Sequence, residues 1–246
     1  MNKDFKQINI LLLSIIFITS STFAGPPFNT DDPVPLNFLH WEFYIASSYQ
    51  FGKYDDNATL PHFEVNYGAV PDVQIHILAG MGYVKEDTDH QYGFMTAEVG
   101  FKYRFINNEA NDFQVGIFPL LEIPTTSTES IVGNDHLQAF LPLWIQKSWG
   151  KFTTYGGGGY WINSGQNNKN SVFVGWEAQY DFSQTLTLGS ELYYESPDTK
   201  DGSNDLVFKV GGYININGEN HILYSIGQSL IHSDDISGYL GYQLTI

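Results

Sequence analysis

The sequence predicts an all-β protein: an antiparallel, up-and-down transmembrane β-barrel of about twelve strands. Three observations carry this prediction: apolar and polar residues alternate along most of the chain, turn-forming residues separate the alternating segments, and the connections are alternately short and long. Aromatic residues make up 16% of the chain, charged residues only 15%, and there are 24 glycines. This composition suits amphipathic strands better than helices.

The first element, residues 1–24, has the pattern of a signal peptide. Lys3 and Lys6 precede an apolar run over residues 8–18, and a small-residue pattern ending at Ala24 predicts cleavage before Gly25. This run is too short to cross a bilayer, and no other segment approaches the roughly 20 apolar residues that a transmembrane helix needs. Any membrane insertion of the mature chain must therefore use strands.

A proline-rich segment, residues 25–36, separates the signal peptide from the barrel expected over residues 37–246. Its prolines fix φ and its carboxylates carry charge; the residues concerned are Pro26, Pro27, Asp31, Asp32 and Pro33. Two interpretations stay open. The segment is either a stiff strap that enters the barrel mouth and narrows the pore, or an ordered periplasmic lead-in to the first strand.

The same alternation defines twelve strands in the remaining chain. They are expected at residues 40–51, 62–67, 73–83, 93–105, 113–123, 136–146, 152–162, 172–182, 186–195, 205–216, 221–228 and 236–246. Turn residues such as Gly, Pro, Asn and Asp follow these segments, as they do in hairpins. The glycine-rich seventh segment and the short eleventh segment match the pattern least well.

The segment GFMTAEVGFKYRF, residues 93–105, shows why a membrane is expected. Met95 and Phe101 lie on one continuous apolar face, while Glu98, Lys102 and Arg104 lie on the opposite face. A soluble sandwich would bury the apolar face and would need more Lys and Glu on every strand than this chain has. A membrane barrel turns the apolar face to lipid, and the sequence favours this arrangement.

The connections give independent support. The short ones fall at 68–72, 106–112, 148–151, 182–184 and 217–220, and the longer ones at 52–59, 85–92, 124–135, 163–170, 196–204 and 229–235. Short turns at one end and long loops at the other, with both termini at the short end, are typical of outer-membrane barrels. Strands of about 11 residues tilted by about 45° cover an apolar band of roughly 25 Å.

On this prediction the polar faces of the strands form a wet interior. The candidate lumen-lining residues are His62, Glu64, His76, Glu98, Lys102, Arg104, Gln114, Glu122, Glu177, Gln179, Glu191, Glu195 and Lys209. Carboxylates dominate this set, so the interior favours cations and neutral solutes over anions. The formal net charge of -16 also argues against nucleic acid as a partner.

His62, Glu64 and His76 are the residues of this set with metal-ligand chemistry. Glu64 and His76 lie six residues to either side of Val70, so they are expected to be cross-strand neighbours. Two imidazoles and a carboxylate can bind a divalent metal, but such groups also form hydrogen-bonded networks. The chain has no cysteine, no GxSxG and no HExxH motif, and we expect neither a cofactor nor enzymatic activity.

Three stretches near the N-terminus carry a family resemblance: GPPFNTDDP at 25–33, HWEFY at 40–44 and LPHFEVNYGAVPDVQIH at 60–76. Together they resemble the MetA-pathway of phenol degradation family. The last ten residues, SGYLGYQLTI, resemble the C-terminal assembly signal of bacterial outer-membrane barrels, with Ile246 in place of the usual terminal aromatic residue. The family resemblance implies exported, transporter-like β-barrels linked to aromatic catabolism, without a defined substrate.

The sequence therefore predicts a monomeric outer-membrane channel or facilitator of a Gram-negative bacterium, used for passive uptake of small solutes. Aromatic solutes are implied only by the resemblance. The expected partners are outer-membrane lipids, the barrel-assembly machinery that binds the C-terminal strand, and a small-molecule solute. A closed structural or ligand-binding barrel plugged by the strap, and an outer-membrane enzyme, are the alternatives.

Overall fold

The computed structural model describes residues 26–246, apart from 53–54, 87, 126–129, 166 and 233. The expected signal peptide and its cleavage point lie outside the described residues. The strands are β1 (Trp41–Phe51), β2 (Asp55–Val70), β3 (Val73–Glu86), β4 (Asp89–Phe94), β5 (Ala97–Asn108), β6 (Phe113–Ile117), β7 (Leu120–Ile123), β8 (Gln138–Trp149), β9 (Phe152–Asn163), β10 (Ser171–Asp181), β11 (Leu186–Glu195), β12 (Asp205–Asn215), β13 (Asn220–Ser229) and β14 (Ile236–Thr245). The described helical structure is the 3₁₀ turn η1 (Glu109–Asn111), and no helix in the described ranges is long and apolar enough to cross a bilayer.

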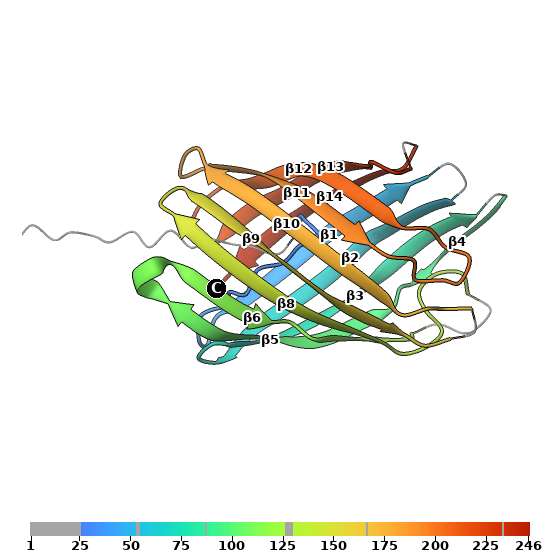
Figure 1. Cartoon of the computed structure of the whole chain (residues 1–246), viewed down its shortest axis with the longest axis horizontal. Helices are drawn as coiled ribbons and strands as arrows, with labels where there is room; N and C mark the ends of the chain where they lie inside the picture. Colours follow the sequence, from blue (N-terminus) through green and yellow to red (C-terminus); the bar gives the residue numbers. More distant parts are fainter. Residues whose placement is uncertain (1–25, 53–54, 87, 126–129, 166, 233) are drawn as a thin grey trace, which may run out of the picture.

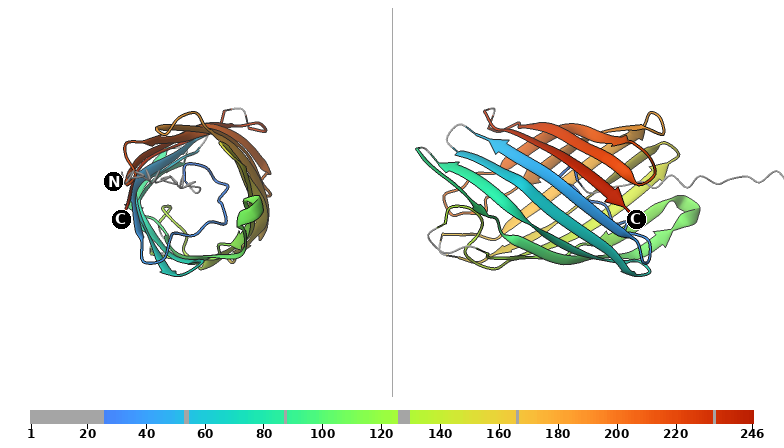
Figure 2. Two further views of the ribbon diagram at one scale, coloured as in Figure 1. Left: turned by 90° about the vertical axis from the view of Figure 1, so that its left-hand side faces the viewer. Right: turned by 180° about the vertical axis from the view of Figure 1, so that it is seen from behind.

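The strands form one closed antiparallel barrel (Figures 1 and 2). β1 pairs with β14 and closes the sheet, with Glu42 opposite Thr245. In the described chain the wall has 12 strands, because β4 and β5 form one wall strand and β6 and β7 form another. The all-β, twelve-stranded prediction is confirmed.

Burial in this barrel is the reverse of burial in a soluble protein. Large apolar side chains cover the outer face: Phe101, Trp176 and Leu240 are 42%, 49% and 61% exposed. Charged side chains are buried on the inner face instead, with Glu177 and Glu191 at most 1% exposed. Because alternate side chains of a strand point to opposite faces, the outside suits lipid and the inside is polar.

The expected long loops at 52–59 and 85–92 are wrong, because strands continue through most of both segments. Asp56 pairs with Lys85, and Tyr83 pairs with Tyr92, so both segments contribute paired residues to the wall. Lys85 and Asp56 also form an ion pair of 3.1 Å. Polar residues on both faces mark the place where a strand leaves an apolar band, and sequence alternation alone mistakes that place for a loop.

The fourth expected strand is not continuous, because it breaks at Met95–Thr96. Tyr92 and Phe94 of β4 face outward from even positions, whereas Phe101 of β5 faces outward from an odd position. The extra residue shifts the phase of alternation, as a bulge does, and Met95 lines the interior instead of the outer face. A second break at Phe118–Pro119 separates β6 from β7.

The two ends of the barrel differ (Figure 1). The turns β2–β3, β8–β9 and β10–β11 lie at the end that holds Ile246, which we call the short-turn end. The longer connections, including residues 196–204 between β11 and β12, lie at the other end, which we call the long-loop end. This layout agrees with the predicted alternation of turns and loops, apart from the two hairpin segments corrected above.

Candidate functional site

Two cavities occupy the inside of the barrel. The cavity at the short-turn end, called here the short-turn cavity, has a volume of about 790 Å³ and reaches Glu219 and Ile246. The cavity at the long-loop end, called here the long-loop cavity, has a volume of about 570 Å³ and reaches Asp198. Phe28 and Asn29 line both cavities, so the N-terminal segment forms the partition between them.

Residues 26–36, the strap, run through the inside of the barrel (Figure 2, blue, in the end-on view). On one side the Ser225 hydroxyl donates to the Pro27 carbonyl at 2.6 Å, and the Lys209 ammonium donates to Asn29 Oδ1 at 2.5 Å. On the far side the Leu36 N–H donates to Gln74 Oε1 at 2.9 Å. The strap is therefore held by β12 and β13 at its start and by β3 at its end.

Lys102 on β5 fixes the middle of the strap. Its ammonium lies 3.0 Å from Asp31 Oδ1 and 3.7 Å from Asp32 Oδ2, and the Lys102 and Asp32 residues are 3% and 0% exposed. Lys102 lines the short-turn cavity, and its charge is matched by the two strap carboxylates. Breaking a buried pair of this kind is costly, because it leaves an uncompensated charge.

Glycine makes room for the strap on the opposite wall. A Cβ at Gly175 of β10 would lie 2.1 Å from Thr30 Oγ1, so no larger residue fits there while the Thr30 hydroxyl occupies this position. The neighbouring Glu191 carboxylate accepts the backbone N–H of Thr30. The close packing and the hydrogen bond together hold the strap against β10 and β11.

Glu177 and Glu191 are directly opposite each other on β10 and β11. Both were expected to line the lumen, and both do point inward, but the strap covers them and neither lines a cavity. Gln179, two residues further along β10, is 4% exposed and lies outside both cavity walls as well. This part of the lumen is filled.

The proposed metal ligands do not come together as a group of three. His76 pairs in register with Asn66, because the β2–β3 pairing shifts near the turn, and Glu64 is its diagonal neighbour at 3.4 Å. His62 Nδ1 instead contacts Thr59 Oγ1 at 2.6 Å. In the described part of the chain, no group of three or more His, Asp or Glu side chains is arranged to hold a metal ion.

Glu98 and Glu122 form a second pair of opposed carboxylates, on β5 and β7. Glu98 lines the short-turn cavity and lies 3.7 Å from His76 Nε2. Glu122 accepts a hydrogen bond of 2.8 Å from the Asn134 amide, which belongs to the connection between β7 and β8. The backbone N–H of Asn134 also donates to Thr96 Oγ1, so Asn134 is held against the wall between β4 and β5.

The remaining predicted residues divide between the two ends. Arg104 donates to Asp72 at 2.6 Å and to Gln114 at 2.7 Å, near the short-turn end. Glu195 and Lys209 line the long-loop cavity. The predicted set therefore does not form one continuous lining, because part of it lies under the strap and part lies at the rim.

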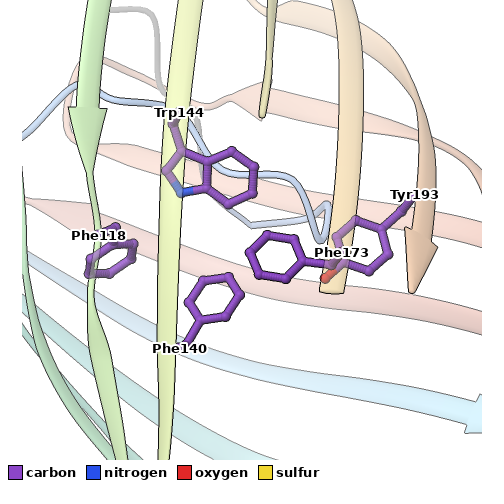
Figure 3. Close-up of a cluster of buried hydrophobic side chains, with 5 residues drawn as sticks. All are labelled: Phe118, Phe140, Trp144, Phe173 and Tyr193. Atoms are coloured by element: carbon purple, nitrogen blue, oxygen red, sulfur yellow. The ribbon is translucent and has the colours of Figure 1, made fainter. Parts of the chain in front are cut away.

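An aromatic cluster that the alternation pattern did not predict lies inside the barrel. Its members are Phe118, Phe140, Trp144, Phe173 and Tyr193, all at most 8% exposed (Figure 3). The rings of Phe140 and Phe173 stack with their centroids 4.5 Å apart, and Trp144 lies 5.8 Å from Phe173. Phe118, Phe140 and Trp144 line the short-turn cavity.

The signal that would have found this cluster is the parity of residue numbers along a strand. Phe140 and Trp144 on β8 share even numbers with the inward-facing Gln138 and Gln146. Phe173 on β10 shares odd numbering with the inward-facing Glu177. Because the outer face is apolar as well, hydrophobicity cannot separate lumenal aromatics from lipid-facing ones, but position in the alternation can.

Known structures share this fold at low sequence identity. The COG4313 outer membrane channel from Pseudomonas putida F1 is 12% identical, with a TM-score of 0.71 over 87% of this chain and 98% of that chain. The KdgM porin is 11% identical, with a TM-score of 0.56 over 82% and 98%. The translocator domain of the autotransporter NalP from Neisseria meningitidis is 11% identical, with a TM-score of 0.57 over 85% and 89%. No protein-family model and no curated protein sequence matches the chain.

Proposed function

We propose that this protein is an outer-membrane channel for passive passage of small solutes. The observation that carries the proposal is the pair of cavities that enter the polar interior from opposite ends and meet at the strap. An apolar outside and a charged inside are what a pore through lipid requires. No enzymatic step is part of the proposal.

The likeness to an outer membrane channel and a porin supports this proposal through the shared barrel. The family resemblance of the N-terminal motifs, to transporter-like barrels of aromatic catabolism, points to the same role and adds small aromatic solutes as candidates. The autotransporter domain shows that this architecture also serves other tasks. The shared barrel alone therefore does not identify a channel, and the proposed channel function rests on the two cavities and the charges that line them.

Passage through this channel requires the strap to shift. Phe28 and Asn29 belong to the walls of both cavities, so a solute that leaves one cavity for the other must pass them. Strap and wall are joined through side chains of single residues, such as Lys102, Lys209 and Ser225. The pore is thus narrow, and its conductance depends on the position of the strap.

Among the described residues, carboxylates outnumber ammonium groups in both cavities. The long-loop cavity is lined by Glu195, Asp198, Asp205 and Asp235 against Lys209. The short-turn cavity is lined by Asp31, Glu42, Glu64, Glu98 and Glu219 against Lys102 and two imidazoles. A pore with such walls prefers cations to anions.

A closed barrel without conductance is the second candidate. The observation that favours it is the number of anchors on the strap, which include the buried ion pairs of Lys102 with Asp31 and Asp32. A strap held this firmly acts as a plug, and the two cavities then become separate binding pockets.

Single-channel recording separates the two candidates. The chain without residues 1–24, called here the signal-free chain, is refolded. Its insertion into a planar bilayer is checked, and currents are recorded under a KCl gradient. Discrete steps with a reversal potential of the cation-preferring sign support the open channel. Silence from inserted protein, together with currents after deletion of residues 26–36, supports the closed barrel.

A further inference from the structure

The short-turn cavity brings an apolar wall and a carboxylate into neighbouring layers of the barrel. Leu120 pairs with Phe140 and with Gly100, and these residues make one layer. Glu98 opposes Glu122 two residues further along the same strands. Two residues of a strand span about 7 Å, so the apolar layer and the carboxylate layer are that far apart.

Glu98 is the carboxylate best placed to receive a ligand beside the apolar layer, because Glu219 lies in the turn before β13. Glu42 accepts hydrogen bonds from Tyr44 and Gln243, Glu64 accepts one from Asn66, and Asp31 binds Lys102. The described contact of Glu98 is with His76 Nε2 at 3.7 Å, and its side chain keeps 23% of its surface exposed. Glu122 across the strand adds a second negative charge to the same layer.

The apolar layer has the shape and chemistry for a flat apolar group. Phe140 packs against Trp161 and Phe173 at centroid distances of 4.6 Å and 4.5 Å, so its ring is fixed in place. Phe118 and Trp144 continue this wall into the cavity (Figure 3). Aromatic walls bind flat rings by stacking or edge contacts and also attract cations.

Resting on the proposed channel function, we infer that the short-turn cavity is a binding subsite for small organic cations that carry an aromatic ring on a short chain. The ammonium group lies at Glu98, and the ring lies against Leu120 and Phe140 about 7 Å away. Even with both imidazoles protonated, the five acidic side chains of this cavity outnumber its three cationic groups, so anions of the same shape are disfavoured.

A matched set of solutes tests the inference. The probes are 2-phenylethylammonium, ethylammonium, 2-phenylethanol and phenylacetate, which vary the ring and the charge separately. Each is added to the signal-free chain in a planar bilayer, and block of the KCl current is recorded. We expect 2-phenylethylammonium to block at concentrations at least about tenfold lower than each of the other three probes.

Three variants locate the subsite. Glu98→Gln should raise the blocking concentration of 2-phenylethylammonium about tenfold, and Phe140→Leu should do the same while leaving ethylammonium unchanged. Glu195→Gln is the matched control, because it removes the same charge from the long-loop cavity. An equal effect of Glu195→Gln and Glu98→Gln would contradict the location and leave only a general preference for cations.

Failure of the subsite is distinguishable from failure of the channel. KCl currents that all four probes block alike, or that phenylacetate blocks best, overturn the ligand class and leave the channel intact. If the inserted protein carries no current, titration calorimetry of the folded protein in detergent with the same probes tests binding directly. Absence of heat with 2-phenylethylammonium then overturns the subsite.

Discussion

The described part of the barrel holds two pairs of opposed glutamates in the same local geometry, yet the pairs have different roles. Glu98 and Glu122 face each other across β5 and β7, and Glu177 and Glu191 across β10 and β11. Like charges directly opposite each other destabilise a sheet, so in each pair other interactions must offset the repulsion between the two carboxylates. The strap covers the second pair, while Glu98 of the first pair lines the short-turn cavity.

The difference shows that the strap, rather than the strand pattern, decides which charges a solute meets. Glu191 is 1% exposed and accepts the Thr30 N–H, so its charge serves to hold the strap. Glu98 keeps contact with the short-turn cavity. The strap contacts both sides of the barrel, through Lys102 on β5 and Glu191 on β11, but Glu98 keeps its place in a cavity wall while Glu191 does not.

Removing the strap should have the largest effect, because it abolishes the difference between the two sides. Deletion of residues 26–36 joins the two cavities and uncovers Glu177 and Glu191. We expect conductance to rise several-fold and the preference for cations to increase. Single-channel recording checks both, and unchanged conductance in a correctly folded deletion variant would contradict the role of the strap.

Loss of the central anchor should be the next largest effect. Lys102→Met leaves Asp31 and Asp32 without their cation, and breaking a buried pair costs about 3–5 kcal/mol. We expect a lower unfolding temperature and faster cleavage of the strap by protease.

The matched control for this anchor is Lys85→Met. Lys85 pairs with Asp56 at 3.1 Å, but its side chain is 47% exposed, and surface pairs contribute only about 0–1 kcal/mol. Thermal unfolding monitored by band shift on a gel compares the two variants. Equal destabilisation by both substitutions would show that Lys102 does not anchor the strap.

Neutralising one glutamate from each pair should produce a smaller change, confined to selectivity. In the full chain, Glu98→Gln should lower the cation preference, and Glu177→Gln should leave it unchanged, because the strap separates Glu177 from both cavities. In the strap-deleted chain both substitutions should lower it. Reversal potentials under a KCl gradient measure the effect, and a strong effect of Glu177→Gln in the full chain would contradict the account.

The smallest expected effect concerns the connection between β7 and β8. The hydrogen bond with Asp135 raises the pKa of the His136 imidazole above its ordinary value. A raised folded-state pKa gives stabilisation that is complete below the unfolded-state pKa and is lost as the pH rises through the folded-state pKa. Asp135→Asn should therefore increase proteolysis of this connection at pH 5 and have no effect at pH 10.

The connection between β7 and β8 also contacts one of the two glutamate pairs and not the other. Asn134 binds Glu122, so loosening the connection at high pH frees Glu122 of the first pair but neither glutamate under the strap. Limited proteolysis with mass spectrometry follows cleavage near His136. A pH-independent difference between the two chains would rule out the imidazole as its cause.

The sequence was sufficient to predict which side chains of the barrel wall face outward and which face inward. Alternation places Phe101 outside and Lys102 inside correctly, because a period of two directly encodes the two faces of a strand. It failed at Met95, where one extra residue reverses the phase, and at Lys85, where the strand continues beyond the apolar band. Both failures occur where a polar or irregular residue interrupts an otherwise regular signal.

The inside of the barrel was only partly predictable. Inward-facing glutamates look alike in sequence, and only contacts between distant segments, such as Thr30 with Glu191, distinguish a covered carboxylate from an accessible one. The aromatic cluster shares its hydrophobicity with the lipid-facing residues, so it stayed hidden. The inward orientation of Phe140 and Trp144 could nevertheless have been predicted, because they share even numbers with the inward-facing Gln138 on the same strand.

The central claim is that passage depends on movement of the strap past the β10–β11 wall, and a reversible crosslink tests it most directly. The chain has no cysteine, and a Cβ at Gly175 would lie 3.2 Å from Thr30 Cβ, near the separation of about 3.5–4.5 Å in disulfides. Conductance of the Thr30→Cys, Gly175→Cys protein is recorded before and after a reductant is added. We expect low conductance when the bridge is formed and a rise on reduction. Equal conductance in both states, with the bridge fully formed beforehand, would contradict a moving strap.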